Sequence, residues 1–469
     1  MRTEHYDVVV IGSGSGNSLP GEEFADLRVA VVEAGVFGGT CLNNGCIPTK
    51  MFVWTAETAN RVREVEQFGL SAELTDVRWT EIRDRVFHRI DPISEGGARY
   101  RREAEGTDLY EGWARFTGER QLDVALHEGG TVRLTADQVV IATGSAPTVP
   151  DALAPLMGTV GHTNRTIMRL EKLPARMTIV GGGVVAVEFA HVFSGLGVEV
   201  TLVVRGERLL RDLDEELSLA FTALARKRWD VRTGTEVTGA EVVGAGTGAH
   251  LTLDDGETLE TEVVLVATGR RPATDGLDAD AAGVRVDEQG FVECDEHGRT
   301  SAEGVWTLGD VCDPTMLKHV ANAQARVVFH NLVHPEELQS FPTVPVVAGV
   351  FSTPEIGTVG LTEAQAREAG HEVVTHTQEY AAVAYGWAME DHTGRCRVIA
   401  DADTGQVLGG WVMGHQAAIL VNLLGEAVIS QEPAHEWARG RYWPHPALSE
   451  VVENALLGLP APRGTAAGR

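Results

Sequence analysis

Two cysteines, Cys41 and Cys46, are the residues whose types and spacing most directly indicate chemistry in this chain. Four residues separate them, which is too short a loop for a structural disulfide to gain much loop-closure entropy. Pro48, Thr49 and Lys50 follow, then an apolar run, so we expect a helix that begins near Cys46. A helix N-terminus favours a thiolate, and Lys50 would lie one turn deeper on the same face. The pattern therefore predicts a redox-active dithiol.

Two other interpretations of the cysteine pair are open. The two residues are also compatible with buried thiols that never pair. A zinc site is the other alternative, but it would need a second Cys/His pair at ligand spacing, and none accompanies these cysteines in the sequence. The remaining cysteines, Cys294, Cys312 and Cys396, are interpreted as ordinary thiols.

The segment before the cysteines has the pattern of a dinucleotide-binding unit. An apolar strand at residues 6–11 runs into Gly12 and Gly14, with Asn17 at the third position of the fingerprint. Glu33 closes the next strand, about twenty residues on, where an acid hydrogen-bonds an adenosine ribose. An ordinary glycine-rich turn is the alternative. The Pro20-Gly21 pair predicts that the usual crossover helix is short or broken.

A second fingerprint follows a strand at residues 177–180 and contains Gly181, Gly183 and Ala186, with Glu188 two residues into the helix. The next strand, residues 199–204, ends in arginines instead of an acid. Such cations accommodate a ribose 2′-phosphate, which predicts NADPH over NADH. A solvated basic turn is the alternative interpretation of these residues, which are Arg205, Arg208 and Arg211.

Two strands that each end in Ala-Thr-Gly mark the crossings between an outer domain and an inserted one. The first leads into Thr143 and Gly144, the second into Gly269. The predicted domains are residues 1–148 with 267–338, an insertion at 149–266, and a C-terminal domain at 339–469. Asp310 ends a returning strand, where an acid can hold sugar-like hydroxyls beside a nucleotide; a turn or cap aspartate is the alternative interpretation.

The composition limits the partners. The net charge of −28 and pI near 4.9 argue against nucleic acid or an anionic membrane surface as a partner. No apolar run approaches 18 residues, the start of the chain lacks a signal pattern, and the cysteine number is odd, so we expect a cytoplasmic protein. Residues 458–469 are rich in Pro, Gly and Ala and are expected to be disordered.

Two nucleotide units, a Cys-x₄-Cys-x₃-Lys element, a Gly-Asp strand end and a terminal His-Pro-x₃-Glu together resemble the flavin disulfide reductase family, which includes glutathione reductase, mercuric reductase and lipoamide dehydrogenase. The resemblance covers nearly the whole chain. It implies an α/β fold with two Rossmann-like domains, FAD in the first and NADPH in the second, and a C-terminal α+β dimerisation domain that closes a homodimer.

The resemblance also implies roles for individual residues. Cys46 would face the flavin, Cys41 would attack the substrate, and His445, oriented by Glu450, would serve the other subunit's site as the acid–base residue. Taken alone, His445 would more often be a surface histidine. Lys50 would lie near the flavin and pair with Glu188. The implied FAD contacts are Gly12, Gly14, Asn17, Glu33, Gly39, Thr40, Lys50, Thr143, Gly144, Asp310 and His319; the implied NADPH contacts are Gly181, Gly183, Ala186, Glu188, Arg205, Arg211 and Gly269.

The substrate inference follows from two observations. The glutathione-reducing members supply arginines from the helix after the first fingerprint, whereas residues 19–24 contain two acids and no arginine. The segments at residues 38–54, 317–322 and 385–391 look most like the mycothione reductase branch of the family, whose substrate is an uncharged, hydroxyl-rich disulfide. The alternatives are an NADH-linked dihydrolipoamide dehydrogenase, or a flavoprotein that no longer turns over and serves as a binding or structural protein.

Overall fold

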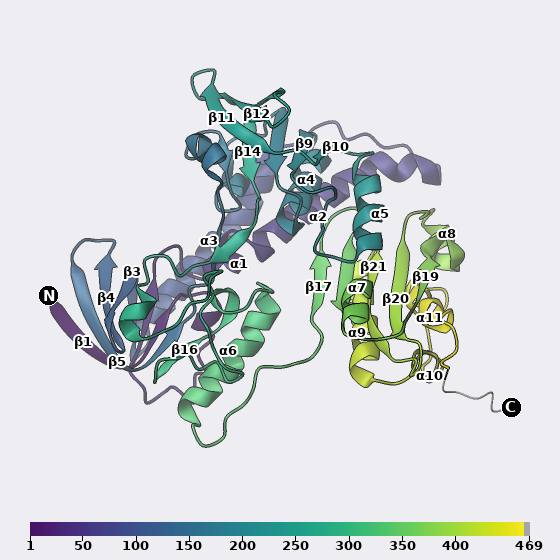
Figure 1. The fold of residues 1–469 in the computed structure, drawn as a ribbon. Coiled ribbons are helices and arrows are strands. Elements are labelled where there is room, and N and C mark those ends of the chain that lie inside the picture. Colours follow the sequence, from purple (N-terminus) through teal and green to yellow (C-terminus); the bar gives the residue numbers. More distant parts are fainter. Residues whose placement is uncertain (464–469) are drawn as a thin grey trace.

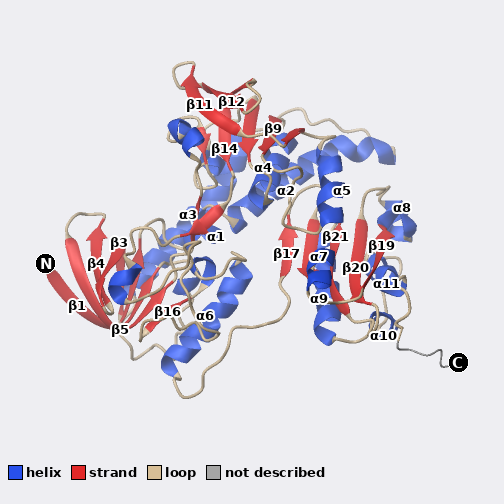
Figure 2. Ribbon diagram, viewed as in Figure 1, coloured by secondary structure: helices blue, strands red, loops and turns tan. Residues whose placement is uncertain are grey.

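The computed structural model describes residues 1–463 and contains three sheets that matter for function (Figures 1 and 2). In the first sheet, parallel pairing joins the strands in the order β3-β2-β1-β5-β16, and β4 pairs antiparallel with both β3 and β5. Its core strands are continuous runs of Val and Ile, as expected for a sheet covered on both faces. The strands are β1 (Arg2–Ile11), β2 (Val29–Glu33), β3 (Thr107–Gly118), β4 (Gln121–Leu126), β5 (Thr131–Ile141) and β16 (Val305–Thr307).

Two long helices run from this sheet toward the second one. They are α2 (Cys46–Glu64) and α3 (Trp79–Glu103), preceded by the short α1 (Gly39–Asn43). On the first sheet, α6 (Lys318–Val333) packs its buried face on Val8, Val10 and Val140. Because α1 and α2 begin where β2 has just ended, the dithiol lies at the carboxyl edge of the first sheet.

The second sheet is parallel throughout, with strand order β10-β9-β8-β14-β7. It is built from β7 (Gly161–His162), β8 (Arg176–Val180), β9 (Glu199–Val204), β10 (Asp230–Thr233) and β14 (Val263–Val266), with α4 (Val184–Gly195) and α5 (Glu215–Ala225). A small antiparallel sheet of β11 (Val237–Val243), β12 (Gly248–Leu253) and β13 (Thr258–Thr261) adjoins it. The chain enters through β6 (Ser145–Pro147) and leaves through β15 (Arg270–Pro272), which pair with each other.

The third sheet is antiparallel and lies, with its helices, at the other side of the molecule from the first sheet; this part is called the third body below (Figure 1). Val350, Ile356, Trp411 and Met413 share one core cluster with residues of α2, α4 and α5. Its order is β17-β18-β21-β20-β19. The strands are β17 (Val347–Val350), β18 (Ile356–Gly360), β19 (Val373–Glu379), β20 (Arg395–Asp401) and β21 (Val407–Met413); the helices are α7 (Glu363–Glu368), α8 (Ala384–Ala388), α9 (Ala417–Ser430), α10 (Ala434–Arg439) and α11 (Ser449–Leu457). The predicted fold class is confirmed. No helix among the described residues is long and apolar enough to cross a membrane.

The connection between β1 and β2 differs from an ordinary dinucleotide unit as expected. A three-residue 3₁₀ helix, Ser15–Asn17, is followed by turns, and no α-helix forms between the two strands. Pro20 lacks an N–H and Gly21 lacks a side chain, so neither supports helix. The strand β2 nevertheless pairs with β1 in parallel. The anion-binding end of a full helix is therefore absent at this loop.

The tail expectation is wrong for part of its range. Leu459 is buried and the Arg463 backbone N–H donates to Ala402 O at 3.0 Å, so residues 458–463 pack on the third sheet. Residues 464–469 lie outside the described part of the chain.

Candidate active site

The dithiol is held by two consecutive helix starts. Cys41 lies in α1, and Cys46 is the first residue of the nineteen-residue α2. Gly45 joins them at φ −136°, and a Cβ there would stand 2.8 Å from Thr40 O, so only glycine fits this turn. Cys46 is exposed and Cys41 is partly exposed, and both are thiols in this structure. The helix start predicted near Cys46 is confirmed.

The two thiols differ strongly in acidity. A hydrogen bond from Cys41 is the largest cause that lowers the pKa of Cys46 to about 7, and the Lys50 ammonium acts in the same direction. The same bond, together with burial, raises the pKa of Cys41 well above its usual range, against the Lys318 ammonium. One sulfur is therefore poised as a thiolate near neutral pH, while the other holds its proton until a base removes it.

Lys50 is fixed from two sides. Its Nζ lies 2.7 Å from both carboxylate oxygens of Glu188 in α4, and its ammonium lies 4.4 Å from the centre of the Phe351 ring. The Glu188 side chain is only 8% exposed, and its Oε1 also accepts the Phe351 backbone N–H at 3.0 Å. The predicted pairing of Lys50 with Glu188 is present, and it joins α2 to α4 and to the end of β17.

An open cavity of about 600 Å³ lies against Cys46. Besides Cys46 and Lys50 it is lined by Ile47, Met51, Trp54, Arg85 and Arg89. Arg85 Nη2 donates to Thr55 Oγ1 at 2.7 Å, and Arg89 is exposed. These two arginines come from α3 and were not predicted from the sequence, because the substrate prediction rested on the segment after the first fingerprint. The position of a residue along a long helix does not by itself predict which cavity its side chain lines.

His445 and Glu450 form a pair in the third body. His445 Nδ1 lies 2.8 Å from Glu450 Oε1, and the Ala447 backbone N–H donates to Oε2 at 3.1 Å. The hydrogen bond from His445 is the largest cause that lowers the pKa of Glu450. An ionised carboxylate only accepts, so Nδ1 carries a proton and Nε2 is the atom available for exchange. The His445 side chain is 71% exposed.

One chain does not bring this pair to its own dithiol. In Figure 1, α11, which contains Glu450, lies at the far side of the third body from α1. The candidate site is therefore divided between two places on the molecule, as expected if each subunit supplies His445 to the other.

The loops at the carboxyl edge of the first sheet fit FAD. Gly12 has φ +110°, and a Cβ there would stand 2.2 Å from Ala142 O; a Cβ on Gly39 would stand 2.7 Å from the Gly14 Cα. These close approaches leave backbone N–H groups uncovered by side chains. Glu33 ends β2, and its Oε2 accepts hydrogen bonds from the Ser13 backbone N–H (2.9 Å) and from Ser13 Oγ. Thr40 is exposed beside them.

The opposite side of this cradle comes from the crossing strand and the Gly-Asp turn. Thr143 Oγ1 is buried and has no hydrogen-bond partner within residues 1–463, and beside it Gly144 has open space where a Cβ would point. Asp310 Oδ2 accepts from Ser145 Oγ at 2.6 Å. An unpartnered buried hydroxyl next to an open glycine is the state expected of a ligand-binding group. His319, the second residue of α6, is exposed.

Two details of the first fingerprint differ from the sequence interpretation. The close-packing role given to Asn17 falls to Gly16, where a Cβ would lie 2.7 Å from the Ala142 Cβ. Asn17 instead accepts Arg101 Nε at Oδ1 (2.7 Å) and Arg101 Nη2 at its backbone oxygen (2.9 Å). Lys318 Nζ donates to Ser15 Oγ at 2.8 Å. No role for Lys318 or Arg101 was predicted from the sequence, yet both bring cations to the loop that has no α-helix.

The second fingerprint is regular. Gly181 has φ +135° and no room for a Cβ, which would stand 2.1 Å from Ala267 O. Gly183 caps α4 with open space around it, Ala186 is fully buried, and Gly269 lies at the facing crossing with φ +125°. Arg205 directly follows β9 and is exposed, as is Arg211. Arg211 Nε lies 3.5 Å from Asp212 Oδ1 at the surface. The exposed glycine backbone at the start of α4 and the two exposed guanidinium groups fit a phosphorylated dinucleotide.

Within the described residues, no group of three or more His, Cys, Asp or Glu side chains is arranged to hold a metal ion.

Comparison with known proteins places this geometry in context. Residues 6–326 match the family described as pyridine nucleotide-disulphide oxidoreductase, and residues 346–456 match its dimerisation domain. The mycothione reductase of Mycobacterium tuberculosis (strain H37Rv) is 49% identical over 97% of this chain and 100% of its own length. The dihydrolipoyl dehydrogenase of Thermus scotoductus is 36% identical over 97% of both chains. The HOCl-induced flavoprotein disulfide reductase RclA of Escherichia coli superposes with a TM-score of 0.84 at 25% identity, covering 96% of this chain and 99% of that one.

Proposed function

The chain belongs to the pyridine nucleotide-disulphide oxidoreductase family, and from this premise we propose that it is an NADPH-dependent flavoprotein that reduces mycothione to two molecules of mycothiol. The observation that carries the proposal is the greater identity to the mycobacterial mycothione reductase than to the dihydrolipoyl dehydrogenases, over alignments of the same extent. The dithiol with one acidic sulfur is the chemical support, because a disulfide reductase needs a thiolate and a protonated partner.

We assign the FAD site to Gly12, Gly14, Asn17, Glu33, Gly39, Thr40, Lys50, Thr143, Gly144, Asp310 and His319, and the NADPH site to Gly181, Gly183, Ala186, Glu188, Arg205, Arg211 and Gly269. When bound, FAD supplies the transfer of two electrons from NADPH to the Cys41–Cys46 disulfide. The chain's own contribution is to place Cys46 at a helix start beside Lys50, where its thiolate is stable after reduction.

The disulfide exchange is assigned to the two thiols in turn. Cys41 attacks one sulfur of the substrate and releases the first thiol, and Cys46 then attacks the Cys41 sulfur and releases the second. The raised pKa of Cys41 means that a base has to take its proton before the first attack. His445 Nε2 is that base, and it returns the proton to the departing thiolate, while Glu450 holds the imidazole tautomer.

This division of roles requires a homodimer, in which His445 of each chain completes the site of the other. The matched dimerisation domain supplies the means. Exposed apolar side chains on the third body, including Tyr442 and Ile419, fit a surface that a second copy covers. We also propose a cytoplasmic location, and domain bounds of 1–148 with 267–338 for FAD, 149–266 for NADPH and 339–469 for the interface.

The test is NADPH oxidation by the purified protein with mycothione, glutathione disulfide and lipoamide side by side. Turnover with mycothione alone supports the proposal. The Cys46→Ser variant is the control for mechanism, because it keeps a small polar group at the helix start but cannot form the disulfide. If the Cys46→Ser protein still reduced mycothione, the proposed mechanism would be refuted.

An NADH-linked dihydrolipoamide dehydrogenase is the second candidate, since relatives of that class are 36% and 33% identical to the chain. It predicts faster reduction by NADH than by NADPH and turnover with lipoamide. Arg205 and Arg211 oppose it, because an acid at the end of the corresponding strand would select the unphosphorylated ribose.

The cavity refines the substrate argument. Arg85 and Arg89 line it, so the absence of arginine from residues 19–24 does not by itself exclude an anionic disulfide. Replacing both with glutamine separates the cases. If the substrate is uncharged, the variant keeps kcat/KM for mycothione within about threefold, whereas an anionic disulfide would lose about tenfold or more per lost charge-assisted contact.

A further inference from the structure

A second pair of thiols meets outside the site described above. Cys294 and Cys312 are far apart in the sequence, but the Val292 backbone N–H donates to Val311 O at 2.9 Å and brings the two segments side by side. The two thiols lie close enough that each is the largest cause of the pKa shift of the other. Cys294 is exposed and Cys312 is partly exposed, so this pair is accessible from solvent on one side.

The chemical division within this pair parallels that of Cys41 and Cys46. The neighbouring Cys312 thiol is the largest cause that lowers the pKa of Cys294, while the Cys294 sulfur and burial raise the pKa of Cys312 well above its usual value. Cys396 shows the contrast: it is fully buried, and burial alone raises its pKa. Cys294 is thus an exposed nucleophile with a protonated thiol beside it.

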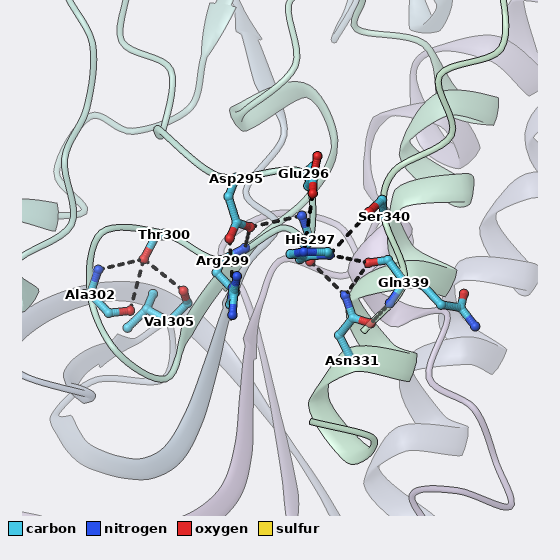
Figure 3. A network of polar contacts seen from close by, with 10 residues as sticks. All are labelled: Asp295, Glu296, His297, Arg299, Thr300, Ala302, Val305, Asn331, Gln339 and Ser340. Carbon is cyan, nitrogen blue, oxygen red and sulfur yellow. Dashed lines mark hydrogen bonds and ion pairs between the residues drawn. The ribbon is translucent and has the colours of Figure 1, made fainter. Parts of the chain in front are cut away.

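The segment that carries Cys294 is rigidly anchored (Figure 3). Asp295, the next residue, accepts the His297 and Arg299 backbone N–H groups at Oδ1 (3.0 and 2.9 Å) and Arg299 Nε at Oδ2 (2.8 Å). His297 O accepts Asn331 Nδ2 of α6 at 3.0 Å, as the same view shows. A loop already fixed in place loses little further entropy when a disulfide closes across it.

We propose that Cys294 and Cys312 are a second redox-active pair, which uncharged low-molecular-weight disulfides oxidise to an intramolecular disulfide. The Cys294 thiolate attacks one sulfur of the disulfide RSSR, forms a mixed disulfide and releases RS⁻, which takes up a proton. Cys312 then loses its proton to solvent, attacks the Cys294 sulfur and releases the second thiolate, which is protonated in turn. The pair loses two electrons and two protons, and RSSR becomes two RSH. The step does not depend on which substrate the main site uses.

The charges around the pair select the oxidant. Asp295 and Asp313 both disfavour negative charge at Cys294. A dianionic disulfide such as glutathione disulfide is therefore repelled, whereas 2-hydroxyethyl disulfide, which is neutral, is not.

The pair is connected to the Gly-Asp turn. Cys312 Sγ donates to Gly309 O at 3.3 Å, and its backbone N–H donates to the same oxygen at 2.9 Å. Asp310, which we assign to FAD, is the next residue in this 3₁₀ turn, and Gly309 has φ +77°. Disulfide formation removes the S–H donor from Gly309 O. We expect oxidation to weaken FAD retention by about fivefold, the effect of one hydrogen bond.

The experiment uses the reduced holoenzyme, incubated without NADPH in 2-hydroxyethyl disulfide, alkylated and digested with trypsin. Cleavage after Arg285, Arg299 and Lys318 places Cys294 in peptide 286–299 and Cys312 in peptide 300–318, so the proposed disulfide joins two peptides. Oxidation of the catalytic pair stays within peptide 29–50 and is scored separately. The expected result is the linked pair, formed at least tenfold more slowly with glutathione disulfide.

Three variants make the test decisive. Cys312→Ser should accumulate the mixed disulfide on Cys294 without a linked peptide, Cys294→Ser should give neither product, and Cys396→Ser should behave as the unchanged protein. Absence of the linked peptides while peptide 29–50 is fully oxidised would overturn the proposal. So would an equal amount of mixed disulfide in Cys294→Ser. FAD retention is measured as the FAD that passes a protein-retaining filter before and after oxidation. If the linked peptides form but the FAD in the filtrate does not increase, the connection to the Gly-Asp turn is overturned.

Discussion

Removing the Cys41 sulfur is expected to raise the pKa of Cys46. In the structure, the hydrogen bond from Cys41 is the largest cause that lowers this pKa from an ordinary 9.0 to about 7, with the Lys50 ammonium and a backbone hydrogen bond acting in the same direction. In Cys41→Ala the first cause is lost and the others remain. Burial, the second-largest cause, raises this pKa and is larger than the Lys50 contribution that opposes it, so the Cys46 pKa should rise by about one unit or more.

This shift has a measurable consequence for reactivity. With a pKa of about 7, roughly half of Cys46 is thiolate at pH 7, but only about 10% is thiolate when the pKa is about 8. The rate of Cys46 alkylation by iodoacetamide at pH 7 should therefore fall at least about twofold in Cys41→Ala, because the roughly fivefold smaller thiolate fraction is partly offset by the greater nucleophilicity of a more basic thiolate. The loss should disappear at a pH above the pKa of Cys46 in both proteins, where Cys46 is fully ionised in each.

The matched comparison is Cys41→Ser, whose hydroxyl still donates a hydrogen bond to Cys46. Alkylation is followed across pH by the mass of peptide 29–50, which in both variants contains Cys46 as its one cysteine. The midpoint of the serine variant should stay closer to pH 7 than that of the alanine variant. Equal midpoints near pH 7 in both variants would refute the reasoning, because Lys50 and the helix start would then set the pKa alone.

The remaining predictions concern charged groups. Glu188→Gln leaves the Lys50 ammonium without its anion and should lower stability by about 2 kcal/mol, seen as a lower melting temperature; an unchanged melting temperature would contradict this. Glu450→Gln should lower kcat about 10²-fold while NADPH still reduces the bound flavin normally, since only proton transfer is affected. Replacing Arg205 and Arg211 with Gln should raise KM for NADPH about tenfold and leave KM for NADH unchanged, whereas equal effects on both nucleotides would make these residues a plain basic turn. Lys318→Gln should slow reaction of the reduced enzyme with disulfide about fivefold, because its ammonium favours the Cys41 thiolate; an unchanged rate would exclude this role.

The parts of the site that sequence predicts are those fixed by local rules. Cys46 lies at a helix start because Gly45 permits the turn and an apolar run follows. Glu33 ends β2 and Asp310 follows β16 by three residues; both strands belong to the parallel part of the first sheet, whose carboxyl ends share an edge, so both residues are expected at that edge. The absence of a helix after the first fingerprint is also predictable, because Pro20 lacks the backbone N–H and Gly21 has a low helix propensity.

The parts that sequence does not predict are contacts between remote segments. Gly16 takes the close-packing position because the shortened turn places it, and not Asn17, against β5. Lys318 and Arg101 reach the first loop from α6 and α3, and no spacing rule relates those helices to it. The meeting of Cys294 with Cys312 depends on backbone pairing across an irregular segment, for which the sequence has no periodicity to read.

The loss of the first crossover helix connects these observations. A helix N-terminus normally presents about half a positive charge to a dinucleotide pyrophosphate, and a three-residue 3₁₀ turn has too few aligned peptide units to do so. Here Arg101 bonds the backbone of Asn17 and Lys318 bonds Ser15, so two full positive charges stand at the same loop. A helix dipole is fixed in the backbone, whereas the charges of Arg101 and Lys318 are carried by side chains that can move. Lys318 also lowers the pKa of Cys41. The positive field of the flavin site and the acidity of the attacking thiol are thereby coupled through one residue, an arrangement that a regular helix at this position would not provide.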